Sequence, residues 1–145
     1  MMEQKRGWMM DMAKNAVPRI ARAPRAWIYC RMAHSGPDSA GLLAMQRRQL
    51  EACAKEHGFE IVGYSSDVGS GLTFNRPGLL DFLDAVYDEA ADVLLLSDLT
   101  RLGRDMGRAD QFWQLLRGRG IGIYTAVNGE IDLSMKVMLQ KVIGQ

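Results

Sequence analysis

One segment carries both a buried strand and a pair of arginines: Asp92-Val93-Leu94-Leu95-Leu96-Ser97-Asp98-Leu99-Thr100-Arg101-Leu102-Gly103-Arg104-Asp105. Its apolar first half is a continuous run, which is typical of a strand buried on both faces of a parallel sheet. Its polar second half places Arg101 and Arg104 just beyond the predicted strand end. Ligands of open α/β sheets bind outside the carboxyl ends of the strands, and a guanidinium can bond two phosphate oxygens at once. The segment therefore predicts an anion site, unless the two arginines are solvated residues at a helix start with acidic partners.

The composition suits a single domain whose binding site is local. The chain has 145 residues, of which 48% are hydrophobic, and a net charge of +1, so any anion site must come from clustering of arginines. Cys30 and Cys53 lack the spacing of metal ligands, and we interpret them as small buried hydrophobes in a reducing compartment, which favours a cytoplasmic protein. No apolar run is long enough to span a membrane, and residues 1–25 lack the apolar centre of a secretory signal.

The first 24 residues differ from the rest of the chain. They contain several basic residues, scattered methionines and two prolines, without a sustained hydrophobic period. We expect residues 1–24 to form a poorly ordered basic arm. Two explanations stay open, a start codon assigned too early and an arm that binds DNA.

From residue 25 to residue 145, patterns of strand and helix alternate. Short runs rich in β-formers or apolar residues predict strands over 25–31, 59–64, 92–96 and 121–126. Apolar stripes with helical spacing predict helices over 42–57, from 77, over 105–119 and from 134 onward. Residues 65–75 are predicted to be a polar loop. This order predicts an α/β fold with a central, mostly parallel four-stranded sheet and helices on both faces.

Four motifs occur along the chain in a definite order. They are Ile28-Tyr29-Cys30-Arg31-Met32, then Asp67-Val68-Gly69-Ser70-Gly71 with Asn75-Arg76-Pro77-Gly78-Leu79, then Asp92 to Arg104, then Gly120 with Ile131-Asp132. Their order and spacing resemble the catalytic domain of the serine recombinases, the resolvase/invertase family, over about residues 25–145. Each motif is weak alone, but the ordered set is specific.

The resemblance implies a reaction on DNA. In the family, a serine attacks a phosphodiester and becomes linked to DNA, strands are exchanged and the link is resealed, without a metal or another cofactor. It also implies DNA as the partner and a dimer or tetramer as the assembly. Arginines around the phosphate stabilise the transition state, which suits a reaction that needs mostly positioning and electrostatics. Matched motif by motif, the catalytic and DNA-binding arginines are Arg31, Arg76, Arg101 and Arg104.

Two of the matched residues also have structural interpretations. Arg31 ends a strand in apolar surroundings, so a salt bridge is the alternative to a phosphate contact. Asp67 matches an acidic residue of a mobile loop, and we interpret it as a loop-stabilising residue rather than as an acid or base. Thr100 stands where many family members have aspartate, although some carry a hydroxyl residue there.

The position of the nucleophile is the serious departure from the family. The family pattern is Tyr-x-Arg-x-Ser, but here Arg31 is followed by Met32 and Ala33. Residues two apart on a strand face the same way, so Ala33 takes the place of the serine. Ser35, which follows His34, and Ser39 could each reach the phosphate only if the loop folds back, and Ser35 is the candidate nucleophile. We therefore predict that the chain does not cleave DNA as it stands.

The predicted last helix is the other departure. In the family this helix is long, forms the dimer interface and leads to a DNA-binding domain, whereas here it stops at Gln145. We expect a truncated domain with a weakened homo-oligomer. Two rival functions remain. One is a catalytically inactive relative that only binds DNA or a recombinase partner, which Ala33 favours. The other is a flavodoxin-like signalling or nucleotide-binding domain, which would need a phosphate-cradling glycine loop that residues 34–41 do not provide.

Overall fold

The computed structural model describes residues 22–69, 76–103 and 106–133. The predicted arm, apart from residues 22–24, lies outside these ranges, as do the predicted helix after Leu133 and Arg104. The elements alternate as the sequence predicts. They are β1 (Arg25–Met32), α1 (Ser39–Glu56), β2 (Glu60–Val68), α2 (Pro77–Tyr87), β3 (Val93–Leu96), the 3₁₀ helix η2 (Leu99–Arg101), α3 (Met106–Gly118), β4 (Gly122–Thr125) and β5 (Gly129–Glu130).

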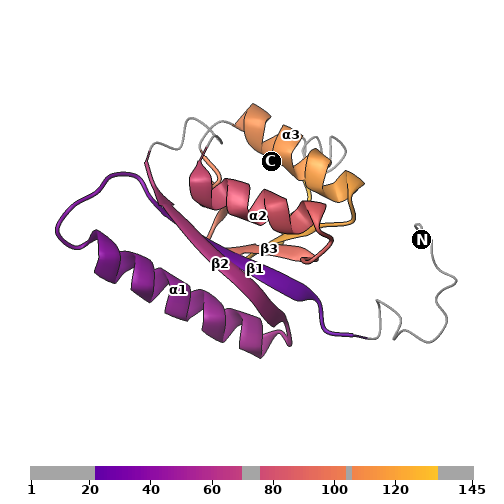
Figure 1. The fold of residues 1–145 in the computed structure, drawn as a ribbon, viewed down its shortest axis with the longest axis horizontal. Coiled ribbons are helices and arrows are strands. Elements are labelled where there is room, and N and C mark those ends of the chain that lie inside the picture. Colours follow the sequence, from indigo (N-terminus) through magenta and orange to yellow (C-terminus); the bar gives the residue numbers. More distant parts are fainter. Residues whose placement is uncertain (1–21, 70–75, 104–105, 134–145) are drawn as a thin grey trace, which may run out of the picture.

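The strands form one sheet in the order β2-β1-β3-β4-β5. The first four strands pair in parallel, and β5 pairs antiparallel with β4. Helix α1 covers one face of the sheet, while α2 and α3 cover the other (Figure 1). The predicted α/β class, parallel sheet and two-sided helix cover are therefore confirmed. The predicted number of four strands was wrong, because the two residues of β5 are too few to show a strand period.

Strand β3 is buried on both faces, as its apolar run predicts. Leu94 and Leu96 belong to the larger core, between the sheet and helices α2 and α3. Leu95, between them, belongs to the smaller core under α1. All three side chains are fully buried. A central strand of a parallel sheet needs apolar residues at every position because both of its faces are covered.

Strand β2 is longer than its sequence pattern predicts. The predicted loop began at Ser65, but the strand continues to Val68. Ser65 and Asp67 face the interior, where hydrogen bonds satisfy them. The Ser65 hydroxyl accepts from Trp27 Nε1 at 2.9 Å and donates to the Gly78 carbonyl at 2.6 Å. The polar residues that indicated a loop are therefore strand residues with buried partners.

The two cysteines are free thiols. Cys30 is fully buried, and burial raises the pKa of its thiol to about 11. Cys53 is only half-buried, contrary to the prediction of two buried cysteines, and it packs at the margin of the core under α1 with its sulfur 3.7 Å from His57 Nδ1. Across the described ranges, no group of three or more metal-ligating side chains is placed to hold an ion. None of the helices described is long and apolar enough to cross a membrane.

Candidate functional site

Three of the four predicted arginines meet at the carboxyl edge of the sheet. Arg31 is near the end of β1, Arg101 follows β3 in η2, and Arg76 immediately precedes α2. Arg31 Nε and Arg76 Nη1 both donate to the carbonyl oxygen of Arg101, each at 3.0 Å. Arg101 Nη1 donates in return to the carbonyl of Arg31 at 3.0 Å. We call these three residues the arginine cluster.

Arg31 is almost completely buried, with 5% of its surface exposed. Besides the carbonyl of Arg101, its guanidinium donates to the carbonyls of Gly69 and Thr100, the latter at 3.0 Å. Its backbone N–H donates to Gln46 Oε1 at 3.1 Å. These backbone acceptors hold the guanidinium beside the turn that follows β3.

Arg76 is equally buried, with 4% of its surface exposed, and it belongs to a hydrogen-bond chain through the core. Its Nη1 donates to the Tyr29 hydroxyl at 3.1 Å, and its Nη2 donates to the carbonyl of Leu102. The Tyr29 hydroxyl donates to Asp67 Oδ2 at 2.8 Å. Burial and the bond to Asp67 raise the pKa of Tyr29, so the phenol stays protonated and can donate.

Asp67 fixes the start of helix α2. Its carboxylate accepts from the backbone N–H groups of Gly78 at 2.8 Å and Leu79 at 3.1 Å. The first N–H groups of a helix have no partner within the helix, and a carboxylate there is also favoured by the helix dipole. Gly78 is required by this close approach, because a Cβ at that position would lie 2.6 Å from the carbonyl oxygen of Ser66. These contacts agree with the interpretation of Asp67 as a stabilising residue.

Arg101 is the most exposed member of the cluster. Its side chain is 29% exposed. Its Nε donates to Ser97 Oγ at 3.1 Å and also lies 3.8 Å from Asp98 Oδ2. Asp98 also accepts from the backbone N–H of Thr100 at 2.9 Å and from the Thr100 hydroxyl. Arg101 therefore has an acidic partner, as the alternative interpretation expected, while part of its side chain is exposed to solvent.

The serines near the family's nucleophile position make no hydrogen bond to the cluster among the described residues. Ala33 follows the end of β1 and is exposed, and Ser35 is exposed in the loop before α1. Ser39 begins α1, where its Oγ accepts from the N–H of Gly36 at 2.6 Å. Within the part of the chain that the structure describes, no hydrogen bond joins Ser35 to His34 or to the arginine cluster. Among the described residues, the serine bonded to the cluster is Ser97, whose Oγ accepts from Arg101 Nε at 3.1 Å, and not Ser35 or Ser39.

Sequence reasoning assigned no role to Gln46, which supports the cluster from α1. Its side chain is 7% exposed and bonds both backbone groups of Arg31, accepting from the N–H at 3.1 Å and donating to the carbonyl at 3.5 Å. The sequence signal that could have identified Gln46 is its position on α1. Gln46 shares the buried face of α1 with Leu50 and Ala54, where an apolar residue is expected.

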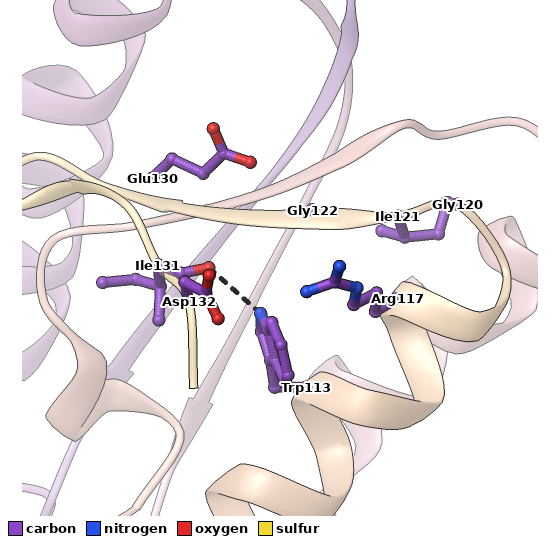
Figure 2. A pocket seen from close by; sticks show the side chains of 8 residues that line it. All are labelled: Trp113, Arg117, Gly120, Ile121, Gly122, Glu130, Ile131 and Asp132. Carbon is purple, nitrogen blue, oxygen red and sulfur yellow. Dashed lines mark hydrogen bonds between the residues drawn. The ribbon is translucent and has the colours of Figure 1, made fainter. Parts of the chain in front are cut away.

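A pocket of about 400 Å³ lies at the opposite edge of the sheet. It is formed where α3 ends and β4 begins, next to the residues after β5. Figure 2 shows Trp113 and Arg117 of α3 beside Ile131 and Asp132, with the Trp113 indole donating to the Ile131 carbonyl at 3.0 Å. No member of the arginine cluster lines this pocket, so the predicted site and the pocket are separate features.

Comparisons with known proteins agree with this fold. The family model described as "Resolvase, N terminal domain" matches residues 26–144. The solved C-terminal catalytic domain of ISC1926 TnpA, an IS607-like serine recombinase, is similar to this chain, with 27% identity over 83% of this chain and 78% of that one and a TM-score of 0.64.

Two further solved structures share the fold. The N-terminal catalytic domain of TP901-1 integrase is 18% identical over 83% of this chain and 91% of that one, with a TM-score of 0.65. A resolvase family site-specific recombinase from Streptococcus pneumoniae is 19% identical over 83% of each chain, also with a TM-score of 0.65. The sheet and helices described above are therefore those of a recombinase catalytic domain.

Proposed function

The chain belongs to the resolvase N-terminal-domain family of serine recombinases, and from that premise we propose that it acts in site-specific DNA recombination by binding a DNA phosphate at the carboxyl edge of its sheet. The observation that carries the proposal is the convergence of Arg31, Arg76 and Arg101 there. Family membership removes the flavodoxin-like alternative.

The physical chemistry of the cluster supports phosphate binding. Arginine does not lose its proton in proteins, and its planar fork matches the oxygens of a phosphate. With a net charge of only +1, the chain offers no general attraction to DNA, so a local cluster must supply it. Arg101 is the member whose side chain is most exposed, and it would contact the phosphate first.

Binding and cleavage are separate steps in this proposal. Arginines stabilise a phosphate and its transition state, but the covalent step needs an attacking oxygen. Ala33 supplies none, and Ser35 is exposed in the loop before α1. We propose a domain that binds DNA, or a recombinase partner on DNA, without cutting it. Homo-oligomerisation and a cytoplasmic location stay predictions.

The salt dependence of DNA binding tests the proposal. Each phosphate contact contributes about −0.9 to the slope of log affinity against log salt concentration. Four arginine contacts, Arg104 included, predict a slope of about −3.6 for a short duplex, measured by fluorescence anisotropy. The Arg101→Gln variant should reduce the magnitude of the slope by about 1, equally for all sequences.

The control variant is Arg117→Gln. Arg117 is exposed and lies at the opposite edge of the sheet, so its replacement should leave the salt slope of DNA binding unchanged. An unchanged slope in Arg101→Gln would count against the arginine cluster as the phosphate site. Tight, sequence-selective binding by the chain alone would require an element that reads bases and that the proposal lacks.

A further inference from the structure

The arginine cluster is occupied by the protein's own backbone. Three consecutive carbonyls, those of Thr100, Arg101 and Leu102, accept hydrogen bonds from the guanidiniums of Arg31 and Arg76. The two arginines are only 5% and 4% exposed, so a DNA phosphate cannot reach them while these bonds are in place. We call residues 98–103 the competitor turn.

We propose that the competitor turn is an autoinhibitory contact, in which its carbonyl oxygens hold the arginine donors that a DNA phosphodiester takes in the complex. The turn must move before Arg31 and Arg76 can bind DNA. This inference rests on the proposed function, because it concerns how the same phosphate site is regulated. It predicts that the free protein binds DNA less tightly than its arginines allow.

The exchange of acceptors is chemically favourable. A carbonyl oxygen carries only a partial negative charge, whereas a phosphodiester oxygen shares a full one. The bonds to the carbonyls already have an ionised donor, and a phosphodiester adds an ionised acceptor and can bind one guanidinium through two parallel bonds. A phosphate that reaches Arg31 and Arg76 would therefore displace the carbonyls of the competitor turn, provided that the turn can leave at small cost.

Few backbone hydrogen bonds hold the competitor turn within itself, so much of the cost of moving it lies in its two leucines. It is a single 3₁₀ turn, closed by two backbone bonds, from Arg101 N–H to Asp98 at 3.2 Å and from Leu102 N–H to Leu99 at 3.1 Å. Gly103 follows with a φ of 144°, a conformation that favours glycine. Leu102 is fully buried, and Leu99 is partly buried against the same core, so these two leucines anchor the turn.

Arg101 links the first DNA contact to the opening of the turn. Its Nη1 holds the carbonyl of Arg31, and this bond ties the turn to β1. A phosphate that draws this guanidinium outward removes one of the ties to β1 and leaves the bonds that Arg31 donates to the turn. The order of events is then contact at the partly exposed Arg101, release of the turn, and binding by Arg31 and Arg76.

Loosening the turn without changing any charge tests this. Leu99→Ala removes one apolar anchor, and Leu83→Ala is the matched control, because Leu83 is also partly buried against the same core but lies on α2. If the open state is a minor population, apparent affinity is reduced by its fraction, and loosening restores it. We expect Leu99→Ala to bind a short duplex about tenfold more tightly than the wild type, equivalent to about 1.4 kcal/mol, while Leu83→Ala binds as the wild type does.

Hydrogen exchange on the unmodified protein gives a second readout that does not depend on a variant's folding. The N–H groups of Arg101 and Leu102 are bonded within the turn, and their exchange should accelerate when the duplex is added. Two results would overturn the proposal that the competitor turn is autoinhibitory. One is unchanged exchange at both amides in the complex, and the other is equal affinity of Leu99→Ala and Leu83→Ala for the duplex. If either result came with an Arg101-dependent salt slope, the proposed function would stand. Absence of DNA binding by the wild type and by Leu99→Ala would overturn both.

Discussion

Ala33→Ser is expected to turn a chain that forms no covalent adduct with DNA into one that does. In the family a serine oxygen attacks the phosphorus, a phosphoserine bond forms, and the displaced deoxyribose oxygen leaves with a proton. Position 33 follows the end of β1, two residues after Arg31, and the alanine there is exposed. A hydroxyl at an exposed position should change the stability by no more than about 0.5 kcal/mol.

The assay places both versions on a linker and a DNA-binding domain and looks for a protein–DNA adduct that survives denaturation. We expect none from the unmodified protein, and an adduct from Ala33→Ser. Ser35→Ala is introduced into both backgrounds as the control, and it should change neither result. An adduct formed by the unmodified protein and lost in Ser35→Ala would make Ser35 the nucleophile and refute the prediction.

Asp67→Ala is expected to lower the free energy of unfolding by about 3 kcal/mol or more. Its carboxylate accepts hydrogen bonds from Gly78, Leu79 and Tyr29, and all three donors would lose a charged acceptor inside the protein. Hydrogen bonds to charged groups contribute about 1.5–3 kcal/mol each, and a buried donor left without a partner adds a desolvation penalty. The change also releases Tyr29, and with it one of the contacts that orient Arg76.

Denaturant unfolding measures this loss, with Asp81→Ala as the matched control. Asp81 is an exposed aspartate of α2, so its removal should change the stability by no more than about 0.5 kcal/mol. Equal midpoints for the two variants would show that the Asp67 contacts contribute little, and that α2 is held mainly by its apolar face.

The sequence predicts the sheet better than the loops around it. The run Val93–Leu96 could be identified as a doubly buried strand because every residue in it is apolar. The end of β2 could not, because Ser65 and Asp67 are polar and are satisfied by partners on β1 and α2, which are distant in the sequence. Local patterns do not contain that information.

The same limit applies to the site. Convergence of Arg31, Arg76 and Arg101 follows from strand order, since the carboxyl ends of parallel strands meet at one edge. Their burial does not follow from it. It depends on how η2 folds back so that its carbonyls face the guanidiniums, which only the tertiary structure determines. The support from Gln46 likewise requires knowing that α1 packs its polar residue over Arg31.

The central claim is that DNA lies on the carboxyl edge of the sheet, and tethered cleavage of DNA tests it most directly. An iron chelate is attached through Ala33→Cys, at this edge, or through Glu130→Cys, beside the pocket at the opposite edge. Both are made in a Cys53→Ser background, and the buried Cys30, with a pKa of about 11, does not compete for the reagent. The account predicts that a bound duplex is cut by the chelate at position 33 and not at position 130. Cutting from position 130 alone would contradict it.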